Sequence, residues 1–190
     1  MSKKAFVTYE NFDLQKVKVI DKVVDIRYFN LENPNRIEHP EGKDLPHPHL
    51  IEAMQGFKEI FALHSGDLKG WLFARDNIKG DLEASKGALD GYNQEVENHN
   101  VSGISYIGDK AKGIQITGSK KIDTGSIGYA SPRLFFESEV IDYGTESQEL
   151  FEKVKLEVYN YLFKGKFGVK KQKEETDPNQ TSILDEDQQD

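Results

Sequence analysis

Residues 101–122 read VSGISYIGDKAKGIQITGSKKI, and they carry the strongest β-structure signal in the chain. Two runs rich in Val, Ile and Tyr, from Val101 to Ile107 and from Ile114 to Ile122, flank a short segment of Gly, Asp, Lys and Ala. β-branched and aromatic residues favour strands, and glycine with polar residues favours the turn between them. The stretch therefore predicts a β-hairpin.

Strand-like sequence also fills the N-terminal part of the chain. Ala5 to Tyr9 and Val17 to Phe29 are rich in Val, Ile, Tyr and Phe. We predict that they form an antiparallel pair joined across Asn11 to Gln15. Further strands are expected at Arg36 to His39 and at Arg133 to Val140.

Two apolar stripes at helical spacing predict helices. The first helix follows Pro46 and Pro48, which favour the first turn, and is expected to end at a Gly66 C-cap. Its apolar face comprises Leu50, Ile51, Met54, Phe57, Ile60 and Phe61. The second helix closes the folded part of the chain, and Thr145 with Gln148 fits a capping box at its start. Its apolar face comprises Leu150, Phe151, Val154, Val158, Tyr161 and Leu162.

Residues 1–165 are expected to fold as a single α+β domain, because 190 residues suffice for one ordinary domain. The order of elements favours an antiparallel or mixed sheet with one central and one C-terminal helix, and an OB-like barrel is the narrower alternative. Residues 67–100 are predicted to be an insertion or mobile lobe, weakly helical from Asp81 to Glu97. Residues 123–131 are expected to be a glycine-rich link.

Residues 166–190 are expected to form a disordered basic hinge and acidic tail. Glu174 to Asp190 holds seven acids, no base and only two large apolar side chains, so this segment cannot offset the entropy of ordering itself. Five lysines lie between Lys164 and Lys173, immediately before the tail. Residues 1–163, with twenty bases and twenty-six acids, carry a net charge of −6.

The chain contains no cysteine, which excludes disulfides, thiol catalysis and cysteine-ligated zinc. The N-terminal MSKKAFVTYE lacks the apolar run of a signal peptide. No stretch approaches the ~18 consecutive apolar residues of a membrane-spanning helix. We therefore expect a soluble cytoplasmic protein without a membrane partner.

Three histidines, His39, His47 and His49, lie within eleven residues of one another. Imidazole and neighbouring carboxylates can bind Zn, Mn or Fe, which leaves a histidine-dependent metalloenzyme open as a third hypothesis. The spacing matches no standard metal site, and no nucleophile or phosphate-loop motif is present. We therefore predict a non-enzymatic protein with no cofactor and no metal.

Aromatic and basic residues suggest contact with single-stranded DNA, because aromatic rings stack on bases and cations meet phosphates. The predicted contact residues are Tyr28, Phe29, Trp71, Phe73, Arg75, Lys110, Lys112, Lys120, Lys121 and Arg133. The alternative is an interaction module that binds a host or phage protein and has no affinity for nucleic acid.

The acidic tail is expected to occupy the protein's own basic groove until DNA displaces it, or to dock on replication or recombination proteins. Its candidate docking element comprises Ile183, Leu184, Asp185, Glu186 and Asp187. In this layout the tail resembles those of phage and bacterial single-strand-binding proteins. The terminal aromatic residue common in such tails is missing, since the chain ends Gln188-Gln189-Asp190.

The chain is also similar to a loose group of small tailed-phage proteins encoded among replication and recombination genes. The resemblance rests on Leu45 to Lys58, on the hairpin Val101 to Lys121 with its ending Gly118-Ser119-Lys120-Lys121, on Ser131 to Leu134 and on the closing amphipathic helix. It implies a role in DNA metabolism in the host cytoplasm and assigns no catalytic residue. The leading hypothesis is a non-catalytic, phage-type single-stranded DNA-binding or recombination and replication accessory protein.

Overall fold

The computed structural model describes residues 7–42, 44–66, 68, 82–108, 112–137 and 143–168. These residues form the α+β arrangement that the sequence predicts. The elements, in chain order, are β1 (Phe12–Ile20), β2 (Val23–Asn30), β3 (Asn33–Glu38), β4 (Glu41–Gly42), α1 (Pro48–Gln55), α2 (Lys58–Ser65), α4 (Leu82–Glu97), β5 (His99–Ile107), β6 (Gly113–Ile122), β7 (Gly125–Ala130), β8 (Leu134–Phe135) and α5 (Gly144–Phe163).

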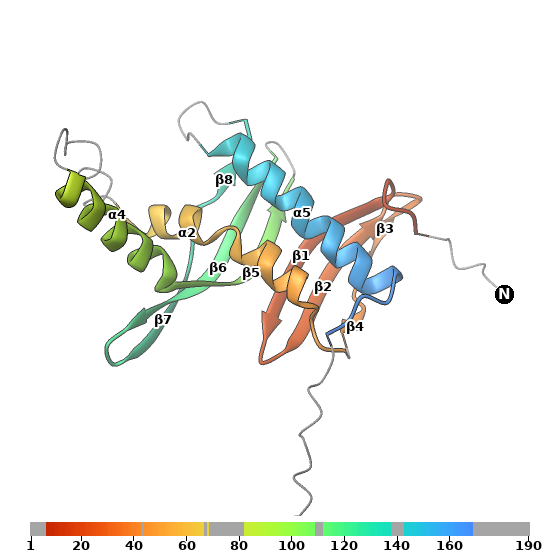
Figure 1. Ribbon diagram of the computed structural model, residues 1–190. Helices are drawn as coiled ribbons and strands as arrows, with labels where there is room; N and C mark the ends of the chain where they lie inside the picture. Colours follow the sequence, from red (N-terminus) through yellow and green to blue (C-terminus); the bar gives the residue numbers. More distant parts are fainter. Residues whose placement is uncertain are drawn as a thin grey trace, which may run out of the picture.

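The strands form one antiparallel sheet in the order β3-β2-β1-β5-β6-β7, with β4 also paired to β2 and β8 also paired to β6 (Figure 1). This order ends at β3 and β7 and does not return on itself. The sheet is therefore open, and the OB-like barrel is not confirmed.

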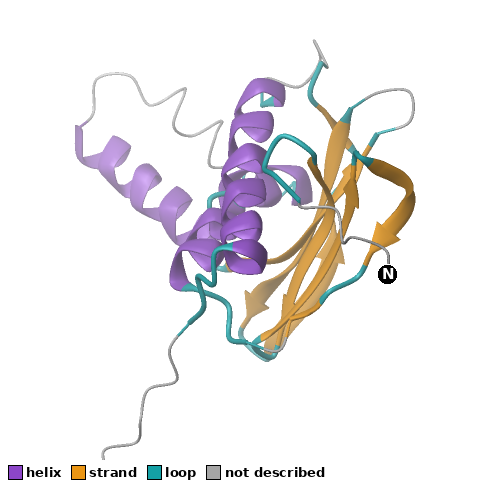
Figure 2. Cartoon of the chain, turned by 90° about the vertical axis from the view of Figure 1, so that its right-hand side faces the viewer, coloured by secondary structure: helices purple, strands orange, loops and turns teal. Residues whose placement is uncertain are grey.

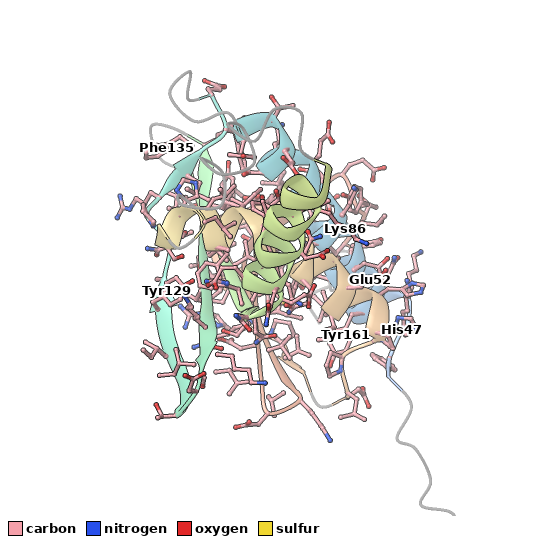
Figure 3. The ribbon with its side chains drawn as sticks, turned by 60° about the vertical axis from the view of Figure 1, so that its left-hand side comes forward. His47, Glu52, Lys86, Tyr129, Phe135 and Tyr161 are labelled. Atoms are coloured by element: carbon pink, nitrogen blue, oxygen red, sulfur yellow. The ribbon has the colours of Figure 1, made fainter. Side chains whose placement is uncertain are left out.

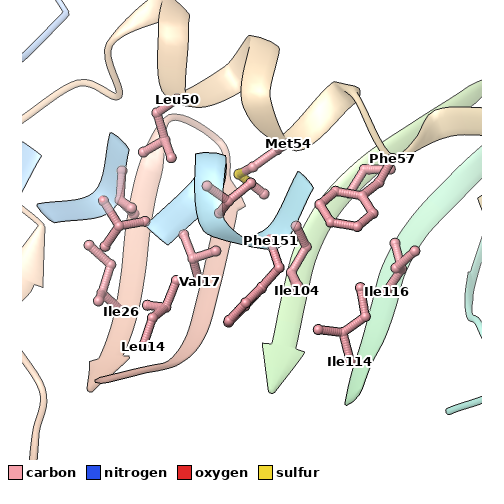
Figure 4. Packing of buried hydrophobic residues seen from close by; sticks show 14 of the residues in the cluster. Leu14, Val17, Ile26, Leu50, Met54, Phe57, Ile104, Ile114, Ile116 and Phe151 are labelled. Carbon is pink, nitrogen blue, oxygen red and sulfur yellow. The ribbon is translucent and has the colours of Figure 1, made fainter. Parts of the chain in front are cut away.

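The described helices gather on one side of this sheet, so the domain has two layers (Figure 2). The core lies between the layers and is filled by apolar side chains from both (Figure 4). The sheet contributes Leu14, Val17, Ile26, Ile104, Ile114 and Ile116, and the helices contribute Leu50, Met54, Phe57 and Phe151. These side chains are buried because strands alternate their faces and helices repeat theirs every three to four residues.

The predicted hairpin at residues 101–122 is confirmed. β5 and β6 pair from His99 opposite Lys120 to Ile107 opposite Gly113, with an irregularity between Val101 and Gly103. The alternating apolar residues of the two strands face the core together, which sets the register of the pair.

The prediction for the N-terminal strands was wrong in its boundaries. Residues 12–30 form a hairpin, β1 and β2, whose two-residue turn is Asp21 and Lys22. Both turn residues have positive φ, 49° and 71°, as a type I′ turn requires. The sequence Asp-Lys lacks the glycine that usually marks this turn, so residues 17–29 looked like one continuous strand.

The first predicted helix is two helices. α1 ends at Gln55, and α2 begins at Lys58 after a turn at Gly56 and Phe57. Gly66 does end α2 with φ 86°, as predicted. The N-cap of α1 is His47, whose Nδ1 accepts from the His49 backbone N–H at 3.1 Å.

The closing helix is present as α5, but the predicted capping box is wrong. The N-cap is Tyr143, which makes no side-chain capping hydrogen bond. The helix is instead held by its apolar face, with Phe151, Val154 and Val158 buried against the sheet. Packing therefore stabilises this helix without the local cap.

Two other predictions need correction. The glycine-rich link contains strand β7, which pairs with β6 from Thr117 opposite Ala130 to Ile122 opposite Gly125. The strand expected from Arg133 onward has only two residues, Leu134 and Phe135, as β8 among the described residues. The helical stretch expected after Asp81 is confirmed as α4, which joins α2 through the Tyr92 hydroxyl and Glu59.

Candidate nucleic-acid interface on the open face of the sheet

The face of the sheet turned away from the helices carries a group of cations at its centre. Lys16 of β1 lies opposite Arg27 of β2, and Lys18 lies two residues farther along β1. Their neighbours Val17 and Ile26 are buried in the core, so the three cations point to the other face. We call Lys16, Lys18 and Arg27 the basic patch.

Small and polar side chains of β5 and β6 extend this face beyond β1. Lys16 lies opposite Ser105 and Lys18 opposite Gly103, which in turn lies opposite Thr117. Because Gly103 has no side chain, the Lys18 chain can pass close over it, and a Cβ there would lie 3.1 Å from Lys18 Cγ. The patch is therefore bordered by groups small enough to leave its cations accessible.

One carboxylate lies within the patch. Asp25 Oδ2 accepts from Lys16 Nζ at 2.8 Å. This hydrogen bond is the main cause that holds the pKa of Asp25 below its usual range, and the charges of Lys16, Arg27 and His39 add to it. Arg27 and Lys18 are not in the ion pairs found among the described residues, so the patch keeps positive charge available.

Charge is divided between the two layers. The helices α1, α2, α4 and α5 contain ten acids and four bases, a net charge of −6. The strands β1 to β8 contain six bases and four acids, a net charge of +2. The strand layer therefore repels a polyanion less than the helix layer does.

The two aromatic residues predicted on β2 lie on opposite faces. Phe29 is half-buried on the open face, opposite Ile37 of β3. Tyr28 is 7% exposed and packs its ring against Phe12 and Phe163 in the core. Burial of this ring raises the pKa of its hydroxyl. Tyr28 is therefore removed from the candidate interface.

The predicted basic residues of the hairpin also separate. Lys121 is exposed and shares the open face with Thr117, about 13 Å along β6 from it. Lys120 points to the helix side, where its Nζ lies 2.7 Å from Glu95 Oε1 of α4. Lys112 and Arg133 are exposed at the two ends of the β6–β8 pairing.

The remaining predicted contacts lie outside the described residues. These are Trp71, Phe73, Arg75, Lys110 and the tail residues Ile183, Leu184, Asp185, Glu186 and Asp187. Lys16, Lys18 and Arg27 were not among the contact residues predicted from the sequence. The signal that could have found them is the alternation of charged and apolar residues in β1 and β2, which the misplaced strand boundaries obscured.

A second polar cluster joins the N-terminal segment to α5. The Tyr9 hydroxyl donates to Glu152 Oε2 at 3.2 Å, and Lys155 Nζ lies 5.0 Å from the centroid of the Tyr9 ring. Burial, with the charge of Glu152, raises the pKa of Tyr9 to about 12, so this phenol stays protonated at neutral pH. The cluster, with the hydrogen bond from the Tyr159 hydroxyl to the Val7 carbonyl, fixes residues 7–9 on the helix.

The three histidines singled out by the sequence do not come together as one group. His47 and His49 stack edge to face, with centroids 4.6 Å apart. Their nearby carboxylate is Glu157 of α5, and the donor atoms of these three side chains lie within 4.8 Å of one another. His39 lies instead near Asp25 on the sheet, close enough to lower the pKa of that carboxyl.

Comparison with protein-family models, with curated proteins and with solved structures finds no match to this chain. Among the helices that the structure describes, none has both the length and the apolar character needed to cross a bilayer.

Proposed function

We propose that this chain binds single-stranded DNA on the open face of its sheet, as a non-catalytic accessory protein of DNA replication or recombination. The observation that carries the proposal is the basic patch, Lys16, Lys18 and Arg27, on a positively charged strand layer that lies opposite an acidic helix layer. Cations that neutralise phosphates supply most of the sequence-independent affinity for nucleic acid.

Phe29 adds a surface on which a base can stack. It follows Arg27 by two residues on β2, so both side chains lie on the same face of the sheet. An aromatic ring beside cations is the combination that single-strand-binding surfaces use, because every base has a π-face and every nucleotide has a phosphate. The proposed interface is therefore the basic patch with Phe29, extended toward Lys121.

The proposal is tested by fluorescence anisotropy of labelled oligo-dT with the full-length chain at about 50 and about 200 mM salt, the range over which phosphate contacts change affinity strongly. The test variant carries Lys16→Gln, Lys18→Gln and Arg27→Gln. If each cation meets one phosphate, the slope of log affinity against log salt should become shallower by about 2 in this variant.

The matched control removes three cations from the helix side, with Lys86→Gln, Lys153→Gln and Lys164→Gln, all exposed side chains. Its salt slope should equal that of the wild type. Equal losses in both variants would mean that only net charge matters, and the proposed interface would be wrong.

A protein partner is the competing function. Ile20, Val23 and Ile37 are about half exposed on the described part of the sheet, and exposed apolar groups favour protein contacts. No oligo-dT binding by the wild type at either salt concentration would reject the DNA proposal and leave this protein-binding role as the better candidate.

A further inference from the structure

We propose that His47, His49 and Glu157 form a binding site for a divalent transition metal of the Zn²⁺ type. The three side chains supply two imidazoles and one carboxylate, which is a donor set that Zn²⁺ accepts in proteins. Their donor atoms already lie within 4.8 Å of one another, although they come from two different helices.

The fold holds the two helices in place at this point. The Tyr161 hydroxyl donates to the Asp44 backbone carbonyl at 2.6 Å, and Gly168 N–H donates to the Leu45 carbonyl at 2.9 Å. The first bond ties the segment before α1 to α5, and the second ties it to the segment that follows α5. Because Glu157 precedes Tyr161 by one helical turn, its side chain lies on the same face of α5. Figure 3 shows His47 and Tyr161 at this end of the molecule.

The carboxylate is oriented by a second contact. Glu157 Oε2 accepts from Lys166 Nζ at 2.7 Å, and both side chains are largely buried. This bond leaves the other carboxylate oxygen to a metal, and it fixes the orientation of the group, as second-shell partners of metal ligands do.

A groove lined by two of the three residues, His49 and Glu157, leaves room for an external ligand. It has a volume of about 440 Å³, lies between α1 and α5, and is lined by His49, Glu52, Ala53, Leu150, Leu156 and Glu157. Three protein ligands next to an accessible space correspond to a metal site with an open fourth position. Ligand atoms around tetrahedral zinc lie about 3.3 Å apart, so the donor atoms need to move closer by at most about 1.5 Å, which rotation of the exposed His49 ring can provide.

Metal binding should change the start of α1. His47 Nδ1 accepts from the His49 backbone N–H, so in the metal-free protein the proton of this ring is on Nε2. A metal needs one of the two ring lone pairs. Binding at Nδ1 displaces the His49 amide, and binding at Nε2 moves the proton to Nδ1. In both cases the His49 N–H loses its acceptor, which should shift its NMR resonance.

The test is calorimetric titration of the untagged full-length chain with Zn²⁺, with the His49 amide resonance followed in parallel. We expect one Zn²⁺ per chain and a shift of this resonance at saturation. His49→Ala and Glu157→Gln should each weaken binding at least about tenfold, since even second-shell losses weaken metal sites by this amount. His49 is exposed, and Gln at position 157 keeps the shape of the partly buried Glu157 side chain, so both variants should keep the wild-type circular dichroism spectrum.

His39→Ala is the matched control, because it removes the third histidine of the same sequence segment without touching Glu157. It should bind Zn²⁺ as tightly as the wild type. The proposal is overturned if the wild type does not bind, if either His49→Ala or Glu157→Gln binds normally, or if His39→Ala loses binding. Should His49→Ala fail to fold, His49→Gln replaces it with the same expected loss.

Discussion

The ring of Tyr129 on β7 lies flat against the ring of Phe61 on α2, with centroids 4.3 Å apart and planes 11° apart. This stack connects the edge of the sheet to the helix layer. It is possible because Gly118, opposite Tyr129 on the neighbouring strand β6, has no side chain. A Cβ at Gly118 would lie 2.6 Å from Phe61 Cε1 and would also meet the Asn100 carbonyl oxygen.

Gly118→Ala should therefore destabilise the protein by about 1 to 3 kcal/mol, the usual range for overpacking a core. Urea denaturation measures this change in the free energy of unfolding. Gly128→Ala is the control on β7, because the nearest atom to a Cβ there is the Gly118 carbonyl oxygen at 3.7 Å, an ordinary contact. A Gly118→Ala variant as stable as Gly128→Ala would show that the ring stack adjusts without strain.

Lys120 and Lys121 should have different roles although they are adjacent. Lys120 pairs with Glu95, and both side chains are mostly buried, so Lys120→Gln should lower stability by about 1 kcal/mol or more and leave oligo-dT affinity unchanged. Lys121→Gln should leave stability unchanged and make the salt slope shallower by about 0.7, the value for one phosphate of a single strand. Urea denaturation and anisotropy on the same two proteins check both statements. A loss of DNA affinity in Lys120→Gln alone would contradict the assignment.

Asp13→Asn should stabilise the protein at neutral pH. Burial, with a smaller contribution from Glu152, raises the pKa of Asp13, while Lys155, Lys112 and a hydrogen bond from Gln15 oppose this shift. The folded state therefore binds the proton more tightly than the unfolded state. The protonated Asp13 side chain makes its full contribution to the free energy of unfolding at pH values below its pKa in the unfolded chain, about 3.9. That contribution is lost as the pH rises through the pKa of Asp13 in the folded protein.

The gain from Asp13→Asn should be less than about 1 kcal/mol, because the carboxyl is partly exposed to solvent. Urea denaturation at about pH 7 and about pH 3 measures it, and the difference from the wild type should disappear at the lower pH, where both side chains are neutral. A variant less stable than the wild type at pH 7 would mean that the neighbouring lysines stabilise the ionised Asp13 more than burial destabilises it.

Removal of residues 174–190 should tighten binding to single-stranded DNA, because it removes seven acids and no base. The gain should be larger at about 50 mM than at about 200 mM salt, since salt screens the competing charges. Anisotropy with oligo-dT compares the full chain with residues 1–173. A full-length variant in which Asn and Gln replace the Asp and Glu residues of the tail keeps the length of the tail and removes its negative charge. If charge alone opposes DNA binding, this variant should behave like the truncated protein. Equal affinities for all three proteins would exclude a regulatory role of the tail.

Elements whose signals are local could be predicted from the amino-acid sequence. The apolar alternation of residues 101–122 specified a hairpin, and the apolar stripe of residues 150–162 specified α5, because the side chains that form each pattern are neighbours within one element. The sequence also shows how charge is distributed along the chain, and it predicts the α+β class.

Which residues come together depends on long-range packing, and it became visible only in the folded protein. The turn at Asp21 and Lys22 sets the register of β1 and β2, and a register shift of one residue would have turned Lys16 and Arg27 into the core. Docking of α1 against α5 brings Glu157 to His47, a contact between distant segments that no local spacing encodes. Side chains of neighbouring residues in β2 point to opposite faces of the sheet, and the helices cover only one face. Tyr28 is therefore buried under the helices, whereas Phe29 lies on the open face.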